Sequence, residues 1–256
     1  MRSRIDVIAA TLANLAPMRE AYRHEMRCQI VHDSWHARGF TALYRLQIDG
    51  HDAGYGAVGG PPGEPRELVK ELYLVPPARP LAAALFTRLV EMSGAHAIEA
   101  QTNDPLLSEM LDAHAAVVTS ETVLFEAGVD TSLTAPDVSL RPIRPAEKAG
   151  VFPHRHEPVG DWGLERDGAI VATGGLLFHY NPPFADLYME VEPSYRRRGY
   201  GAYLVQALKQ RCDEAGHVPA ARCRADNLAS RRTLERAGLR VCGRIVRGWF
   251  RASAAP

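Results

Sequence analysis

An Asp-Gly dipeptide between two strand-like runs occurs twice in this chain, about half the chain length apart. Asp49-Gly50 is the first copy and Asp167-Gly168 is the second. Asp-Gly favours the tight turn of a β-hairpin. The flanking runs are residues 41–48, 51–58, 162–166 and 169–178. A repeat of this length exceeds the period of a solenoid and predicts two copies of one domain.

The repeated pattern continues beyond each hairpin. A strand at 71–75 and its counterpart at 186–191 are each closed by proline and followed by a helix. Residues 128–137, between the two copies, are polar and contain proline, as is typical of a linker. We therefore expect one domain over residues 1–130 and a second over residues 138–256.

The composition suits a two-domain protein of the cytoplasm. At 256 residues the chain is long enough for two compact domains, and a hydrophobic content of 46% supports well-formed cores. No apolar run approaches the roughly 20 residues that span a bilayer, and no secretory signal is expected at the start. The four cysteines form no CxxC pair, which predicts reduced thiols and a cytoplasmic location. A formal net charge of zero gives no general attraction to nucleic acid or to an anionic membrane.

A short basic loop, Arg196-Arg197-Arg198-Gly199-Tyr200-Gly201, follows a strand at 187–191 and opens a helix at 202–212. The first amides of a helix have no backbone acceptor, and the helix dipole adds partial positive charge there. Glycines let the backbone approach an anion closely, and arginines add donors around it. This order of elements predicts a cradle for a pyrophosphate.

The first copy lacks this loop. Its counterpart is Ala78-Arg79-Pro80-Leu81-Ala82-Ala83-Ala84, in which both glycines are missing and a proline removes one amide donor. We therefore expect the first domain to keep the fold of the second without binding a pyrophosphate.

Two segments resemble the GNAT superfamily of acyl-CoA N-acyltransferases. ADLYMEVEPSYRRRGYGAYLVQALK (185–209) is similar to the family's central strand, its R/Q-x-x-G-x-G/A loop and the helix that follows. ARCRADNLASRRTLERAGLRV (221–241) is similar to the next strand and to a helix opened by asparagine. The resemblance covers about residues 139–250, and the degenerate first half makes the whole chain look like a tandem GNAT protein. It implies an α/β fold with a mixed, mostly antiparallel sheet flanked by helices in each of two GNAT-like domains.

The resemblance also implies acetyl-CoA as the cofactor, bound where strands 187–191 and 220–223 splay apart. The main chain of Val191 would pair with the pantetheine arm, and the basic loop would surround the pyrophosphate. Arg231 or Arg232 would reach the 3′-phosphate. The cofactor-binding residues carried over are Val191, Arg196, Arg197, Arg198, Gly199, Tyr200, Gly201, Ala202, Asn227, Ser230 and Arg232.

Transfer of an acyl group from a thioester to an amine requires a neutral amine, a stabilised oxyanion and departure of the thiolate. Because an alkyl amine is protonated near pH 7, a base or a water chain ending at a base assists the attack. Glu190 is our first candidate for this base and Asp186 is the second, since their spacing places both on one face of a strand. The amide near Val191 is the candidate donor to the oxyanion.

The sequence offers several candidates for the general acid that protonates the leaving thiolate. Many GNAT proteins have a tyrosine in the last helix that protonates the leaving thiolate, and this chain has Leu234 at that position. Tyr188, Tyr180 or Tyr203 is the alternative donor. Otherwise the thiolate leaves unassisted, because its thiol is fairly acidic.

The leading hypothesis is an N-acetyltransferase that moves an acetyl group from acetyl-CoA to a primary amine of a small molecule or peptide. The alternative is an acyl-CoA-binding sensor or scaffold without turnover, which Leu234 at the expected acid position keeps open. Neither nucleic acid nor a membrane is expected as a partner, because the arginines at 196–198 and 231–232 belong to a chain without net charge. A monomer is preferred over a homodimer, because tandem copies satisfy internally the contacts that single-domain relatives make by dimerising.

Two histidine clusters have competing interpretations. His24, Cys28, His32 and His36 recur every four residues, a spacing that aligns metal ligands on a helix. A polar helix face is the preferred interpretation, and no metal is expected. The cluster at 154–157 is expected in a loop, as a candidate contact for the acceptor.

Overall fold

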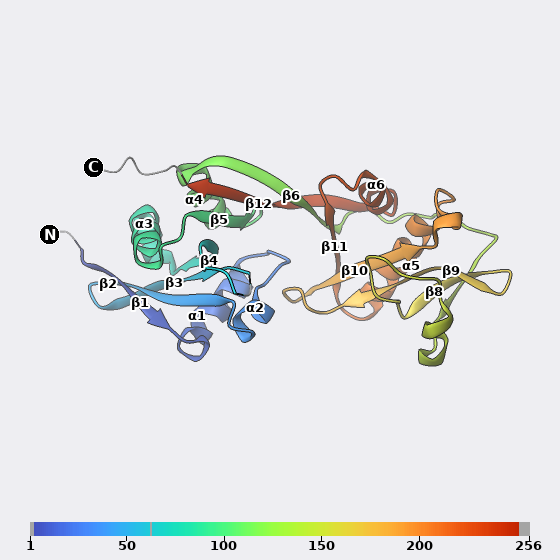
Figure 1. The fold of residues 1–256 in the computed structure, drawn as a ribbon, viewed down its shortest axis with the longest axis horizontal. Coiled ribbons are helices and arrows are strands. Elements are labelled where there is room, and N and C mark those ends of the chain that lie inside the picture. The colour runs from blue at the N-terminus through green and yellow to red at the C-terminus, as the bar shows by residue number, and fades with distance from the viewer. Residues whose placement is uncertain (1–2, 62, 251–256) are drawn as a thin grey trace. The chain divides into compact units, whose positions relative to one another are not determined.

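The computed structural model describes residues 3–61 and 63–250, which form two compact units (Figure 1). The first unit runs to Glu121 and also takes in the chain from Arg244 onward, and the second unit is Thr122–Gly243. The domain boundaries expected from the sequence, 1–130 and 138–256, leave the terminal strand with the second domain instead. Residues 1, 2, 62 and 251–256 of those ranges lie outside the described part of the chain.

The first unit has a mixed sheet with the strand order β1-β2-β3-β4-β5-β12. Its neighbouring strands are antiparallel, except that β4 and β5 are parallel. Its elements are β1 (Ile5–Ala10), α1 (Leu12–Glu25), α2 (Asp33–Ala37), β2 (Thr41–Ile48), β3 (His51–Gly59), β4 (Leu68–Leu74), η1 (Pro76–Leu81), α3 (Ala82–Ser93), β5 (Ala97–Gln101), α4 (Pro105–His114), the beginning of β6 (Ala115–Ala127) and the end of β12 (Leu239–Phe250).

The second unit repeats this plan with the strand order β6-β11-β10-β9-β8-β7. Its strands are antiparallel apart from the parallel pair β10 and β11. Its elements are the end of β6, β7 (Ser139–Pro142), η2 (Pro145–Gly150), β8 (Trp162–Arg166), β9 (Ala169–Leu177), β10 (Phe184–Val191), η3 (Pro193–Tyr195), α5 (Tyr200–Glu214), β11 (Val218–Arg224), α6 (Leu228–Arg236) and the beginning of β12. The mixed, mostly antiparallel sheet expected for each domain is confirmed.

Both predicted hairpins are present as β2–β3 and β8–β9. Asp49 and Asp167 have φ of +50°, and Gly50 and Gly168 follow with φ of +83° and +78°. Positive φ at both central residues is the pattern of the hairpin turn that Asp-Gly favours, because its twist matches that of the strands.

The last described strand of the chain, β12, adds to the first sheet beside β5. Residues from Ile245 to Trp249 of β12 pair with β5, from Gln101 back to Ala97. Alternation of apolar and polar residues identifies a strand and its buried face, but it does not identify the partner strand. The membership of this strand in the first unit therefore depends on a contact across the sequence that local patterns do not reveal.

Helix α5 is held firmly in the second unit, and it carries the basic loop at its beginning. Leu204, Val205 and Leu208 are buried in the core of this unit, each stabilising it by roughly 1.5–3 kcal/mol. A Cβ at Gly201 would lie 3.1 Å from Cγ2 of Thr233 and 3.4 Å from Cε of Met189. Gly201 therefore lets the first turn of α5 pack closely against β10 and α6, rather than serving only the approach of a ligand.

The first unit has a separate core around Tyr55, Phe86 and Leu89, all of them fully buried. Separate cores agree with two copies of one domain, since each copy must bury its own apolar residues. Within residues 3–61 and 63–250, none of the helices has the length and apolar character needed to cross a membrane.

Candidate active site

Strands β10 and β11 separate at Asp186. They pair in parallel only at Phe184 with Val218, Ala185 with Pro219, and Asp186 with Ala220. On its other side β10 stays paired with β9 as far as Val191. Residues 187–191 therefore have one strand edge without a strand partner, which is the splayed arrangement expected from the sequence.

The main chain of Val191 points into this opening. The next residue, Glu192, donates its N–H to the carbonyl of Val171 at 3.0 Å, on the β9 side. Successive residues of a strand direct their N–H groups to opposite sides, so the N–H of Val191 faces the side that β11 has left. Its carbonyl accepts a hydrogen bond from Nε of Arg196 at 3.0 Å. Val191 thus offers one amide donor at the place where a pantetheine arm or an oxyanion is expected.

The beginning of α5 is not capped by a side chain. Gly199 is the N-cap residue with φ of +87°, and the N–H of Tyr203 donates to its carbonyl at 3.0 Å. The N–H groups of Tyr200, Gly201 and Ala202 precede that first helical bond and have no acceptor within the helix. These donors, together with the helix dipole, fit an anion such as a pyrophosphate.

A further arginine faces this loop from α6. A Cβ built on Gly199 would lie 3.9 Å from Nη2 of Arg236, with no other described heavy atom nearer. A longer side chain at position 199 would therefore occupy the space between the helix amides and this guanidinium. Sequence reasoning missed Arg236, because it lies 37 positions downstream of the loop (236 − 199) and only the packing of α6 beside α5 brings it there.

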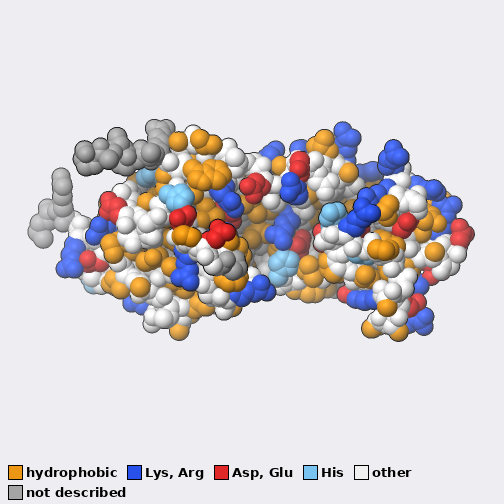
Figure 2. Space-filling model, viewed as in Figure 1, with side chains coloured by type: hydrophobic (Ala, Val, Ile, Leu, Met, Phe, Trp, Pro, Cys, Tyr) orange, Lys and Arg blue, Asp and Glu red, His pale blue; other side chains and the backbone are white. Residues whose placement is uncertain are grey.

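The predicted loop arginines have different surroundings. Arg196 is exposed but binds the carbonyl of Val191, and its Nη2 lies 3.9 Å from Glu190. The guanidinium of Arg198 lies 5.3 Å from the ring centroid of Tyr195. Arg197 and Arg232 are exposed, and Figure 2 shows many basic side chains on the visible face of the second unit. Such exposed cations suit the phosphates of a nucleotide.

Two other predicted cofactor residues, Tyr200 and Asn227, use their side chains for structure. The buried hydroxyl of Tyr200 donates to Asp137 and accepts from Nη1 of Arg166 at 2.8 Å. Oδ1 of Asn227 accepts from the N–H of Ser230 at 3.0 Å and so caps α6. Tyr200 therefore has only its main chain to offer a ligand, and the acceptor oxygen of Asn227 is engaged by the helix.

Glu190 is buried and anchors a loop. Its carboxylate accepts hydrogen bonds at 3.2 Å from the main-chain N–H groups of Arg155, His156 and Glu157. Burial would raise the pKa of Glu190, but these amides and the nearby His154 outweigh it and hold the pKa below its ordinary value. A carboxylate that is stabilised in its charged form is a weak base.

Asp186 has the opposite environment. It is 7% exposed, and burial raises the pKa of its carboxyl to about 7, although the positive charge of Arg222 and the nearby hydroxyl of Tyr180 act in the opposite direction. Nε2 of His179 lies 3.6 Å from Oδ2 of Asp186. A carboxyl group with a pKa near neutrality accepts a proton readily and is still largely ionised just above pH 7.

Tyr188 lies on the same face of β10 but leans toward β9. A Cβ at Gly175 would lie 2.7 Å from the hydroxyl of Tyr188. Burial raises the pKa of this phenol, and the charges of Asp161 and Glu157 add to the effect. The hydroxyl of Tyr188 therefore lies on the β9 side of β10, away from the opening.

Leu234, at the position where the resemblance leads one to expect a tyrosine, is buried.

The comparisons with known proteins agree with this geometry. The family described as acetyltransferase (GNAT) family matches residues 130–239. Residues 130–239 are a GNAT domain. No curated protein matches the sequence.

Solved structures extend the GNAT fold over the whole chain. An acetyltransferase from the GNAT family of Colwellia psychrerythraea has a TM-score of 0.76 at 16% identity, covering 97% of this chain and 100% of that one. A GCN5-related N-acetyltransferase from Sphaerobacter thermophilus has a TM-score of 0.58 at 15% identity, covering 99% and 98%. A tandem GNAT protein from the clavulanic acid biosynthesis pathway, described without AcCoA, has a TM-score of 0.60 at 14% identity, covering 99% and 99%. The fold is therefore a tandem GNAT arrangement.

The first unit has the same opening between parallel strands, but its own chain bridges it. β4 and β5 pair only at Leu68 with Ala97 and at Val69 with Ile98. Beyond that point, Ile30 donates its N–H to Oε1 of Gln101 at 3.0 Å and accepts from Nε2 at 2.9 Å. The segment that contains Ile30 also contacts β4, because Nδ1 of His32 lies 3.3 Å from Oε1 of Glu71, and it therefore contacts both strands beyond their last pairing.

The counterpart of the basic loop is also engaged within the first unit. Nε of Arg79 donates to the carbonyl of Leu74 at 3.2 Å, just as Arg196 binds Val191 in the GNAT domain. Nη2 of Arg79 then pairs with Glu25. A carboxylate of the chain therefore lies where an anionic ligand would meet this arginine.

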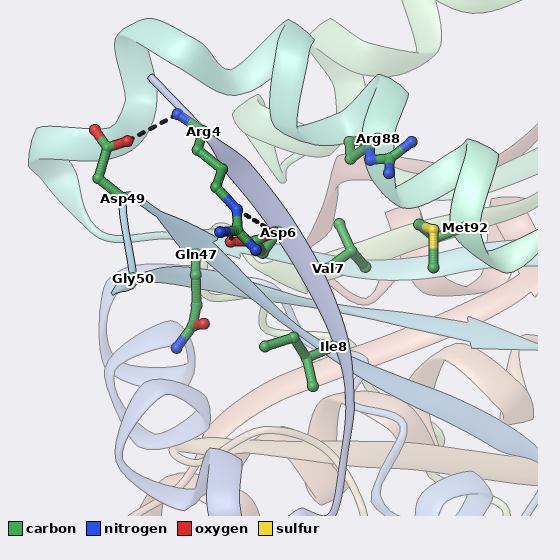
Figure 3. A pocket seen from close by; sticks show the side chains of 9 residues that line it. All are labelled: Arg4, Asp6, Val7, Ile8, Gln47, Asp49, Gly50, Arg88 and Met92. Carbon is green, nitrogen blue, oxygen red and sulfur yellow. Dashed lines mark hydrogen bonds and ion pairs between the residues drawn. The ribbon is translucent and has the colours of Figure 1, made fainter. Parts of the chain in front are cut away.

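A surface hollow in the first unit involves none of the predicted site residues (Figure 3). The main-chain N–H of Arg4 donates to Asp49 at 2.8 Å, and its Nε donates to Asp6 at 3.1 Å. The two acids that line the hollow, Asp6 and Asp49, thus both accept hydrogen bonds from Arg4.

The first histidine cluster has a structural role in the first unit. His32 and His36 contact the fully buried Glu71 at 3.3 and 3.2 Å, while His24 is exposed. Across the part of the chain that the structure describes, no group of three His, Cys, Asp or Glu residues has the geometry to hold a metal ion. Two of the four residues at this spacing, His32 and His36, therefore bind a buried acid.

Proposed function

We propose that this protein is an N-acetyltransferase that transfers an acetyl group from acetyl-CoA to a primary amine, with its active site in the GNAT domain. The observation that carries the proposal is the uncapped beginning of α5, which opens next to the unpaired edge of β10. The two features suit the pyrophosphate and the pantetheine arm of one ligand. The first unit lacks the glycines of the loop and has its opening bridged, so we expect one cofactor site in each chain.

The residues of the GNAT domain fit coenzyme A in three places. The free amides at Tyr200, Gly201 and Ala202 would hold the pyrophosphate together with Arg198 and Arg236. The N–H of Val191 would donate to the carbonyl oxygen of the acetyl group or to the pantetheine arm. Bound acetyl-CoA supplies a thioester, whose C–S bond breaks as the new N–C bond forms.

Asp186 is our preferred general base, ahead of Glu190. It lies at the point where β10 and β11 separate, and its raised pKa suits the removal of a proton from an ammonium group near pH 7. In this scheme Asp186 takes one proton of the ammonium group before attack. The second proton of the nitrogen leaves after the new bond has formed and passes through water to the departing thiolate, while Asp186 returns its proton to the solvent.

Glu190 has a positioning role in this proposal. Its three amide contacts hold residues 155–157 over the face of β10 that also bears Asp186. Loss of the carboxylate would release these amides without removing the proton acceptor.

Release of free thiol from acetyl-CoA, measured with a thiol reagent and a panel of amines, tests the proposal. We expect release that depends on an amine and is lost in Asp186→Asn. Tight binding of acetyl-CoA without release for any amine would favour the alternative, an acyl-CoA sensor or scaffold. Failure of acetyl-CoA to bind would contradict both.

A further inference from the structure

An exposed arginine lies on the same face of the sheet as the proposed base. Asp186 pairs with Ala220, and side chains of a strand alternate between faces, so Arg222 lies on the Asp186 side of β11. The guanidinium of Arg222 lies 5.9 Å from the ring centroid of Tyr180, whose buried side chain is adjacent to Asp186. Arg222 therefore lies beside the opening between β10 and β11.

Arg222 differs from the neighbouring arginines in having no acidic partner. Among the residues that the structure describes, no carboxylate lies within 4.0 Å of its guanidinium. By contrast, Arg224 on the same strand pairs with Asp226 at 2.8 Å, and Arg240 pairs with Glu126 at 2.7 Å. An exposed guanidinium without an acid is ready to bind an anion, and its planar fork matches a carboxylate.

The same face also has groups suited to a cationic amine. Asp186 and Glu157 both lie close enough to Arg222 for its charge to affect the pKa of each carboxyl. Burial is the larger influence and raises the pKa of both groups. Acids and a guanidinium that share one face of the sheet complement a ligand that carries an ammonium and a carboxylate close together.

We infer that the acceptor is an amine that also carries a carboxylate, of the amino-acid class, with Arg222 binding the carboxylate while the nitrogen faces Asp186. The inference rests on the proposed function and specifies its substrate class. It makes Arg222 a specificity-determining residue. A simple polyamine would meet the guanidinium with a like charge and is disfavoured.

Matched substrates test this inference. Acetyl transfer from acetyl-CoA is measured with protein amino acids, with their carboxamides and with the corresponding decarboxylated amines. We expect kcat/KM for the best amino acid to exceed that of its carboxamide by at least about tenfold. Equal or faster transfer to the carboxamide, or transfer only to amines without a carboxylate, would overturn the inference.

Variants separate recognition from chemistry. Arg222→Gln should raise KM for the amino acid by at least about tenfold more than KM for its carboxamide, because only the amino acid loses the partner of its carboxylate. Arg222→Lys should recover part of this loss. Arg240→Gln, which also removes one exposed arginine from the second unit, is the matched control and should leave both substrates unaffected. An equal loss for acid and carboxamide in Arg222→Gln would contradict the role in recognition.

The failure of this inference is distinguishable from the failure of the proposed function. Binding of acetyl-CoA is measured separately by calorimetry. If acetyl-CoA binds but no amine with a carboxylate is acetylated, the substrate class is wrong. If acetyl-CoA does not bind, the proposed function itself fails.

Discussion

Asp186 is the last residue of β10 that pairs with β11, and its partner there is Ala220. One residue further along, β10 has an open edge, so a buried acid with a raised pKa lies at the beginning of the opening. The uncapped α5 lies at the other end of the same strand. This relation orders the site along β10, with proton transfer at one end and anion binding at the other.

The first prediction concerns the basic loop at residues 196–201. Gly199→Asp should reduce the affinity for coenzyme A by at least about a hundredfold, because the carboxylate would lie among the helix amides and repel phosphate. The positive φ of Gly199 adds a strain of roughly 1 kcal/mol for any other residue. Gly216→Asp is the matched control, since Gly216 has φ of +77° and open space around its Cβ. Calorimetric titration with coenzyme A should show normal binding for the control, and normal binding for Gly199→Asp would contradict the role of the loop.

The second prediction concerns the proton acceptor. The value of kcat/KM should rise with pH around a midpoint of about 7, as Asp186 loses its proton. Asp186→Asn should lower the rate by roughly 10²–10⁴-fold and abolish this rise. The measurement is a pH–rate profile with a reactive amine, with binding of coenzyme A as the control that should remain unchanged. An unaltered profile in Asp186→Asn would remove this residue from the mechanism.

The third prediction concerns the stability cost of the same acid. The folded state binds the proton of Asp186 more tightly than the unfolded state, because its pKa is raised from 3.8 to about 7. The free energy of unfolding should therefore fall as the pH rises across this range. Asp186→Asn should stabilise the protein at pH 8 by on the order of 2 kcal/mol and have little effect near pH 4. Thermal unfolding at both pH values measures this, and destabilisation at pH 8 would show that the ionised form is favoured instead.

The fourth prediction concerns Glu190. Glu190→Gln should weaken the anchoring of residues 155–157 and destabilise the GNAT domain by about 1–3 kcal/mol, since the three amides lose their charged acceptor. KM for the acceptor should rise, while the pH–rate profile keeps its rise near 7. The kinetic profile is the deciding measurement. If the rise of kcat/KM near pH 7 is lost in Glu190→Gln and kept in Asp186→Asn, Glu190 rather than Asp186 is the general base.

The fifth prediction concerns the first unit. Titration with coenzyme A should give one site for each chain, because the loop of the first unit lacks glycines and Arg79 is paired with Glu25. Glu25→Gln, which frees Arg79, should still give one site, since the segment at Ile30 continues to bridge the opening. Two sites in the wild-type protein would contradict this account.

Much of the site was predictable from the sequence, because its signals are local. The strand, the basic glycine loop and the helix follow one another along the chain, and the amides of a helix end point outward whatever the surroundings. The predicted ranking of the two acids differs from the one we now propose. The environments of Glu190 and Asp186 depend on the loop at 155–157 and on Tyr180, whose positions local patterns do not specify.

Short-range patterns were sufficient to predict the duplicated hairpins, the tandem GNAT fold and the position of the basic loop. Each of these depends on residues within one or two neighbouring elements. Contacts across the sequence were needed for the rest. Packing placed Arg236 beside Gly199, aligned Arg222 with Asp186, and joined β12 to β5 in the first unit. The pKa of a carboxyl group and the partner of a strand are set by neighbours in space, and those neighbours are known only once the chain has folded.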